Sequence, residues 1–175
     1  MRAAAAWFAV AALTTAASSA DAGDGERAVS LGLGYATYAT PNAEDDDTLT
    51  PTAGAAVVAT YERGVGADTA VRADLVVGGY FGGGTVGSAL ATVGLGYRVD
   101  VLKYVPYLEV GVGALVRTGG PFEPGVEPAL RIGGGVDWLR GRARSYGVAV
   151  IMTSFASETT TLAVSVRSTW RWGYF

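Results

Sequence analysis

The chain has 175 residues, half of them hydrophobic, with a formal net charge of −3 and no cysteine. This length fits a single domain, the lack of cysteine excludes disulfides and thiolate metal sites, and the negative charge argues against a nucleic-acid-binding surface. The 26 glycines argue against a helical bundle, because a glycine inside a helix costs about 1 kcal/mol relative to alanine. Glycine mixed with valine, leucine, threonine and tyrosine favours strands and turns instead.

Residues 1–22 resemble a secretory signal peptide. Arg2 supplies the positive charge, a short apolar core follows, and small residues around Ala20 and Ala22 form a candidate cleavage site. A membrane anchor is the alternative, but the apolar core is shorter than the roughly 20 residues of a spanning helix. We therefore assign residues 1–22 to a signal peptide and residues 23–175 to one exported domain.

After a polar lead, hydrophobic residues alternate with small or polar ones, as expected of strands, whose successive side chains point to opposite faces. In residues 28–38, Val29, Leu31, Leu33 and Tyr35 share one face. Further segments with this period of two follow at residues 53–62, 69–81, 86–98, 104–117, 129–139, 145–155 and 160–175. Turn-forming residues separate them, and the acidic segment 40–52 and the proline-rich segment 118–128 are expected to be loops. The order predicts about eight antiparallel strands in an up-and-down meander.

The final segment indicates a membrane. It is longer than the usual strand of roughly 5–6 residues, and a tilted strand needs roughly 9–11 residues to cross a bilayer. Its hydrophobic face, interrupted only by Ser168, ends in a cluster of aromatic rings, as transmembrane strands do at the headgroup level. That face consists of Leu162, Val164, Val166, Trp170, Trp172 and Tyr174.

A sheet in lipid must close, because an open edge would leave backbone amides unpaired. The predicted fold class is therefore all-β: an antiparallel up-and-down transmembrane β-barrel. Eight aromatic residues are expected at one membrane interface, namely Tyr61, Tyr97, Tyr104, Trp138, Tyr146, Trp170, Trp172 and Tyr174. A thinner girdle of Tyr38, Tyr80, Phe81 and Phe155 is expected at the other.

In these features the chain resembles the small outer-membrane β-barrels of the OmpA, OmpX and OmpW kind, over essentially the whole mature sequence. The signal peptide, the alternating strands and the terminal Phe175 carry the resemblance. Phe175 resembles the C-terminal signal read by the barrel-assembly machinery, although it lies one step out of phase with Tyr174 and the tryptophans before it. The resemblance implies export to the bacterial outer membrane, with its lipids and the assembly machinery as partners. We expect a monomer without a cofactor.

Nine charged residues fall on the face opposite the hydrophobic one. They are Glu62, Arg72, Asp74, Arg98, Glu109, Arg131, Asp137, Arg167 and Arg171. Because buried charges must be paired and side chains just fill an eight-stranded barrel, we expect a salt-bridge network that plugs the interior. The alternative is a narrow polar conduit. Inward glycines leave room for large neighbours or for water, and the sequence leaves that choice open.

The composition argues against an enzyme, because the chain has no histidine. The outer-membrane barrel enzymes that it can be compared with resemble one another in using a catalytic histidine. Without histidine or cysteine, a nucleophile would be a perturbed carboxylate, lysine or tyrosine, and the single lysine, Lys103, lies in a predicted turn. We therefore predict a protein that is not an enzyme.

Three other features are weaker. The acidic run Glu44–Asp47 lacks the spacing of a calcium-binding loop, and the glycine clusters lack the pattern of a phosphate-binding loop, so no metal site is predicted. Arg140, Arg142 and Arg144 form a basic turn that serves solubility or contacts anionic headgroups. The leading interpretation is a structural or surface-exposed outer-membrane protein with a largely plugged polar lumen. The alternatives are a narrow channel for small solutes and a secreted lipocalin-like binding barrel, which would need an apolar interior and a polar exterior.

Overall fold

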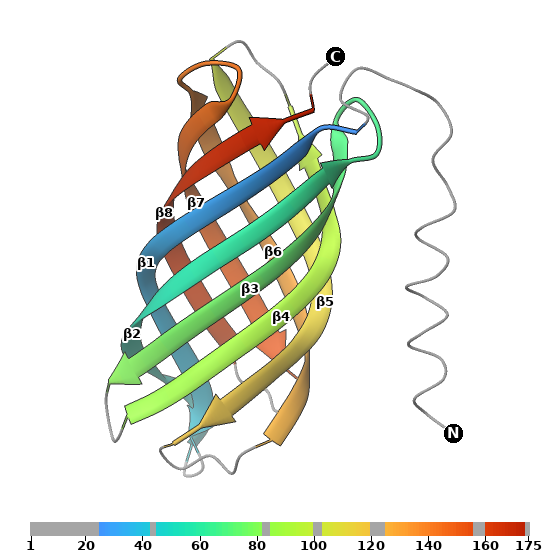
Figure 1. Ribbon diagram of the computed structural model, residues 1–175. Coiled ribbons are helices and arrows are strands. Elements are labelled where there is room, and N and C mark those ends of the chain that lie inside the picture. The colour runs from blue at the N-terminus through green and yellow to red at the C-terminus, as the bar shows by residue number, and fades with distance from the viewer. Residues whose placement is uncertain are drawn as a thin grey trace, which may run out of the picture.

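The computed structural model describes residues 25–42, 45–81, 85–99, 103–119, 125–155 and 160–173. These residues form a closed barrel of eight antiparallel strands that follow one another in sequence order (Figure 1). The strands are β1 (Arg27–Asn42), β2 (Asp45–Gly64), β3 (Thr69–Phe81), β4 (Thr85–Arg98), β5 (Tyr104–Thr118), β6 (Gly125–Leu139), β7 (Arg144–Phe155) and β8 (Thr160–Trp172). The predicted fold class is thereby confirmed. The described residues contain no helix that is both long and apolar enough to cross a membrane.

The barrel closes because β1 pairs with both β2 and β8. Arg27 at the start of β1 lies opposite Trp172 at the end of β8, so both ends of the barrel-forming chain meet at one end of the cylinder, uppermost in Figure 1. We call this the terminal end and the opposite one the distal end. The predicted signal peptide, residues 1–22, lies outside the described residues.

At the distal end the strands are longer than the sequence pattern predicts. β1 continues to Asn42 and β2 begins at Asp45, so most of segment 40–52 is strand and not loop. Beyond Ala39 and before Ala53 these two strands pair only with each other, and they form a hairpin that extends past the barrel wall. Backbone hydrogen bonding continues there although the side-chain alternation has ended. For the same reason, β6 begins at Gly125, within the segment predicted as a proline-rich loop.

The outside of the barrel is hydrophobic. The side chains whose burial is described include 30 exposed large hydrophobic residues, for example Leu33, Leu108 and Val166. They alternate along each strand with inward residues, as the burial of β5 shows from Tyr104 to Thr118. Charged outward residues among those described lie at the strand ends of the terminal end, where Arg27, Arg63 and Arg144 are exposed. The hydrophobic residues therefore form a belt around the middle of the barrel.

The interior has two halves of different chemistry. The half next to the terminal end contains charged side chains, described below. The half next to the distal end contains an ion pair, the buried Arg117 with Glu127, and an apolar plug. The plug is formed by Ala36, Tyr38, Ala56, Tyr80, Val86, Leu90, Leu115, Ala129 and Ile151 together with Val76. The described interior thus combines a charged half with a largely apolar one, whereas the sequence predicts a polar lumen.

Tyr38 and Tyr80 belong to this plug, so their predicted place in an outer aromatic girdle is wrong. Both are buried, and their rings meet edge to face with centroids 5.0 Å apart. The strand alternation continues to Tyr38 without a bulge, because the β1–β2 register shifts only between Pro41 and Asn42. Tyr38 therefore stays in phase with the inward Ala36. Phe81 is exposed on the outside, and the Phe155 side chain lies outside the described residues.

Candidate functional site: the charged interior

The structure places all nine of the predicted inward charges inside the barrel, in the half next to the terminal end. A tenth residue, Glu26, joins them. Together they form the charged cluster: Arg72, Arg98, Arg131, Arg167 and Arg171 with Glu26, Glu62, Asp74, Glu109 and Asp137. Five guanidinium groups face five carboxylates, so the formal charges within the cluster cancel.

The deepest part of the cluster surrounds two arginines from β3 and β6. Arg72 lies 3.0 Å from Glu62 and 2.6 Å from Glu109. Arg131, whose side chain is only 2 % exposed, lies 2.6 Å from Glu109 and 3.3 Å from Asp74. Glu109 thus bridges the two arginines. Charge-assisted contacts of this kind offset the large cost of removing charges from water.

Threonine hydroxyl groups make further hydrogen bonds to the charged side chains of this region. Thr60 donates a hydrogen bond of 2.5 Å to Asp74, and Arg131 donates one of 3.5 Å to Thr92. Both threonines are inward residues of their strands and are buried. They supply partners that a carboxylate or guanidinium needs when water is absent.

A second group of ion pairs surrounds Asp137, which is 1 % exposed. Arg167 donates two hydrogen bonds to its carboxylate, from Nε at 2.8 Å and from Nη2 at 2.9 Å. Arg171 donates a third at 3.0 Å, and Ser145 donates a fourth at 3.2 Å. This two-pronged arginine contact fixes both the distance and the plane of the carboxylate.

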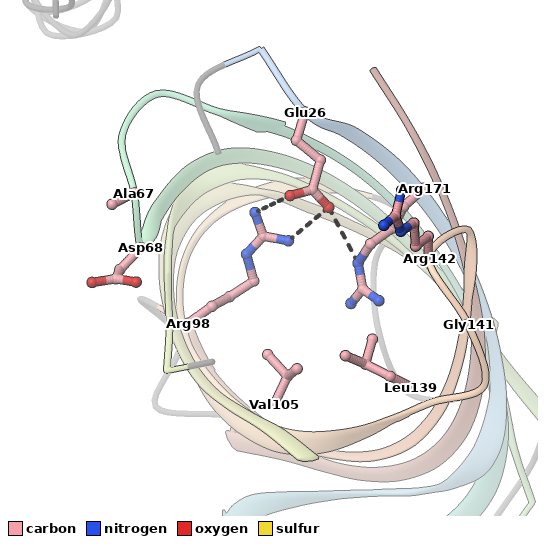
Figure 2. Close-up of a pocket in the computed structure, with 9 residues that line it drawn as sticks. All are labelled: Glu26, Ala67, Asp68, Arg98, Val105, Leu139, Gly141, Arg142 and Arg171. Carbon is pink, nitrogen blue, oxygen red and sulfur yellow. Dashed lines mark hydrogen bonds and ion pairs between the residues drawn. The ribbon is translucent and has the colours of Figure 1, made fainter. Parts of the chain in front are cut away.

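Glu26 connects the two groups at the mouth of the barrel (Figure 2). Its carboxylate lies between Arg98 and Arg171, 3.4 Å from each. Arg98 in turn reaches Glu62 at 4.0 Å. The sequence reasoning missed Glu26, because it lies in the polar lead before the first alternating segment. One signal for it was available in the sequence. The nine predicted residues contain five arginines and only four carboxylates, so a fifth carboxylate was needed to pair every buried charge.

The Tyr107 ring connects the two groups of ion pairs a second time, because it contacts one arginine of each group. The guanidinium of Arg167 lies 4.0 Å from the centre of its ring and that of Arg72 lies 5.6 Å from it. A continuous ring of contacts therefore runs inside the barrel through Arg72, Glu62, Arg98, Glu26, Arg171, Asp137, Arg167 and Tyr107. These side chains come from β2, β3, β4, β5, β6 and β8 and from the residue before β1, so the ring ties distant parts of the chain together.

Glycines on neighbouring strands make room for these large side chains. Gly133 lies directly opposite Glu109, and a β-carbon there would come within 2.7 Å of the Glu109 carboxylate. Gly147 lies opposite both Asp137 and Arg167, and a β-carbon there would meet the Asp137 carboxylate. The inward glycines at these positions therefore accommodate charged neighbours, which is the first of the two roles that the sequence left open.

A cavity of about 250 Å³ opens at the mouth of the barrel, lined by Glu26, Arg98 and Arg171 among others (Figure 2), and only small voids lie deeper in the described interior. A void of about 10 Å³ lies beside Arg72, Tyr107 and Arg131, and another of about 20 Å³ lies in the apolar plug beside Tyr80 and Leu90. A cavity needs roughly 10–15 Å³ to hold one water molecule. Each void therefore has room for about one water, which is far less than a conducting column requires.

Seven of the eight predicted interface aromatics lie on the outside near the terminal end. Tyr61, Tyr97, Tyr104, Trp138, Tyr146, Trp170 and Trp172 are all exposed there. Trp138 has two cations over its ring, Lys103 Nζ and the Arg140 guanidinium, each 5.0 Å from the ring centre. Tyr174 and Phe175 lie outside the described residues, as does Glu44; the backbone of Asp45–Asp47 is part of β2. Within the described ranges, no cluster of three acidic residues is arranged to hold a metal ion.

Comparison with known proteins links this geometry to a class. The sequence matches no protein-family model and no curated protein. Among solved structures, Neisserial surface protein A is similar at a TM-score of 0.65 and 10 % identity, over 84 % of this chain and 99 % of that one. The outer membrane protein OprG from Pseudomonas aeruginosa is similar at a TM-score of 0.61 and 9 % identity, over 87 % and 98 % of the two chains. The chain has the fold of the small eight-stranded outer-membrane barrels.

The resemblance inferred from the sequence is thereby confirmed as a likeness of fold. The same barrel fold also occurs in the outer membrane enzyme PagL, at a TM-score of 0.53 and 16 % identity, over 81 % of this chain and 97 % of PagL. A surface protein and an enzyme share this barrel, so the fold alone does not assign a role. The role must be argued from the belt and the interior.

Proposed function

We propose that the chain is a non-enzymatic integral protein of the bacterial outer membrane, with a sealed barrel that holds its distal hairpin at the cell surface. One observation carries the proposal: the exterior is a hydrophobic belt, while paired charges and an apolar plug occupy the interior. The monomeric state, export by a signal peptide and passage through the barrel-assembly machinery are part of the same proposal.

The belt supports the membrane location. A soluble monomer rarely exposes a contiguous apolar patch larger than a few hundred Å², whereas outer-membrane barrels carry an apolar band about 25 Å tall with aromatic girdles at its edges. The exposed residues of β5, such as Leu108, Val110 and Val112, and the aromatic residues at the terminal end match that pattern. A secreted lipocalin-like barrel would need the reverse sorting, and it would place Arg72 and Arg131 outside.

The filled interior supports a sealed barrel and speaks against the channel. An ion entering from the terminal end would have to displace contacts such as that of Arg171 with Glu26 (Figure 2). It would then meet the apolar plug, where Tyr38 and Tyr80 contact each other, and Arg117, a buried arginine of this half of the barrel, is already ion-paired with Glu127. Carrying an ion through an apolar region without partners costs many kcal/mol.

The non-enzymatic role rests on residue types, because PagL shows that this fold can host an enzyme. This chain has no histidine, the side chain used most often as a general base, and no cysteine, which is intrinsically very nucleophilic. A serine nucleophile would therefore lack its usual histidine partner. The buried carboxylates are engaged with arginines, as Asp137 is with Arg167 and Arg171. They are held as structural anions and not presented to a substrate.

Two measurements test the proposal. Fractionation of the expressing bacterium, followed by gel electrophoresis with and without boiling, should place the protein in the outer membrane and show a folded band that migrates differently from the boiled one. Reconstitution into planar bilayers should give no steps of conductance above the lipid baseline. A protein found in the soluble periplasm would refute the membrane location, and stable conductance steps would refute the sealed interior.

A further inference from the structure

One row of outward residues crosses the barrel near the terminal end. Tyr104 on β5 pairs in register with Trp138 on β6, which pairs with Tyr146 on β7. Tyr146 pairs with Ser168 on β8, and Ser168 pairs with Leu31 on β1. Three aromatic rings are thus followed by one small polar residue and then by a leucine. Ser168 is the position that interrupts the hydrophobic face of β8.

This interruption leaves an open groove on the outer surface. Its walls include Trp138, Tyr146 and Val148 on one side and Leu31 and Val166 on the other. Its floor is formed by Ser168 and by Gly32 and Gly147, which flank the inward Arg167 in register. Gly32 and Gly147 have no side chain and that of Ser168 is short, so none of the three fills the space between the walls. The groove is consequently a shallow apolar trough between aromatic and aliphatic walls.

Two cations stand at the terminal end of this groove. Lys103 and Arg140 each lie 5.0 Å from the ring centre of Trp138, and both are exposed. A backbone hydrogen bond from Leu139 to the carbonyl of Lys103 joins the two segments that carry them. In the described part of the chain, neither cation takes part in an ion pair with a carboxylate. Both are therefore available to an external anion.

We propose that this groove and its two cations bind one anionic phospholipid, with the phosphate at Lys103 and Arg140 and an acyl chain in the groove. The inference rests on the proposed membrane location. The order of chemistry along the barrel axis matches that of a lipid: cations come first, then the aromatic ring of Trp138, then the apolar trough beside Val148 and Val166. Cations near a membrane surface attract anionic headgroups, and aromatic rings lie at the headgroup level. A free phosphate would use the cations but not the groove.

The test uses Trp138 as its own reporter. In the mature chain with Trp170→Phe and Trp172→Phe, Trp138 is the one tryptophan left, since Trp7 belongs to the predicted signal peptide. The protein is reconstituted into vesicles that contain phosphatidylcholine and phosphatidylglycerol. In one preparation the phosphatidylglycerol carries brominated acyl chains, and in the other part of the phosphatidylcholine does. Brominated chains quench tryptophan fluorescence on contact. We expect stronger quenching by brominated phosphatidylglycerol, with a preference of roughly thirtyfold, because two surface cations contribute.

Matched variants locate the effect. Lys103→Gln with Arg140→Gln should remove the preference, whereas Arg27→Gln with Arg63→Gln, which removes two cations from the β1–β2 side of the same rim, should keep it. Ser168→Leu, which fills the trough, should reduce the preference at least threefold, whereas Ala91→Leu on the outer face of β4 should leave it unchanged. Each variant is first shown to fold by its migration on unboiled gels.

The outcomes separate the two proposals. Equal quenching by both brominated lipids in the parent protein would overturn the lipid site while leaving the membrane barrel intact. An equal loss of preference in the Arg27/Arg63 variant would also overturn it, because the effect would then belong to rim charge in general. Absence of quenching by either lipid, with no folded band on unboiled gels, would instead count against the membrane location itself.

Discussion

Arg167 lies over the ring of Tyr107, with its guanidinium carbon 4.0 Å from the ring centre. The phenol oxygen of Tyr107 is buried and has no hydrogen-bond partner in the described structure. The ring and not the hydroxyl thus makes the contacts by which Tyr107 joins the two groups of ion pairs. Gly135, directly opposite Tyr107, leaves the space that this ring fills, because a β-carbon there would come within 2.6 Å of the phenol oxygen.

Tyr107→Phe and Tyr107→Leu should therefore differ. Phenylalanine keeps the ring and removes a buried unpaired hydroxyl, so the free energy of unfolding should stay the same or rise by about 1 kcal/mol. Leucine removes the ring beneath two guanidinium groups and should lower that free energy by about 2 kcal/mol. Urea unfolding of the barrel in detergent micelles, followed by tryptophan fluorescence, measures both. A large loss in the phenylalanine variant would mean that the hydroxyl has a partner.

Arg131 should be among the least replaceable residues. Arg131→Met leaves Glu109 and Asp74 with one fewer cation in a region closed to water, and removal of one partner from a buried ion pair costs about 3–5 kcal/mol. The same unfolding experiment should show this loss. Glu26→Gln at the partly exposed mouth is the comparison and should cost about 1 kcal/mol or less. Equal losses at the two positions would show that water reaches the deep part of the cluster.

Gly147 should not accept a side chain. In Gly147→Ala the new β-carbon would lie within 2.6 Å of the Val136 carbonyl and would also meet the Asp137 carboxylate. Overpacking of this kind typically costs about 1–3 kcal/mol. Gly66→Ala is the control, because nothing lies within 4 Å of a β-carbon there. The difference in unfolding free energy between the two variants measures the effect, and its absence would show that β6 and β7 can separate without cost.

Val110→Arg tests the environment of the belt. Val110 is 48 % exposed at mid-height on β5, and arginine at the bilayer midplane of a transmembrane barrel costs about 2–4 kcal/mol. Thr69→Arg, at the terminal end of β3, should cost less than about 1 kcal/mol. Unfolding from lipid vesicles compares the two variants. In a soluble barrel, both outward-facing substitutions would stay within about 0.5 kcal/mol of the parent.

Two errors in the sequence prediction have physical causes. Segment 40–52 was predicted as a loop because its side chains are polar, but the backbone of Thr40 still pairs with that of Thr50, and backbone pairing does not depend on polarity. Tyr38 and Tyr80 were assigned to an outer girdle because they lie near strand ends. Strict alternation without a bulge places them inside, next to Ala36 and Gly78.

The sequence by itself determined which side chains share a face, because alternation is a local property of an extended backbone. From that period follow the number of strands and two faces, one apolar and one with the arginines and acids. The tertiary structure places the apolar face outside. Only the tertiary structure decided which charges meet. Closure brings Ser30 within 2.7 Å of Thr169, 139 residues apart, and brings Glu26 between Arg98 and Arg171. Such contacts depend on strand register and barrel closure, which are set by hydrogen bonds between segments far apart in the chain, so no local pattern contains them.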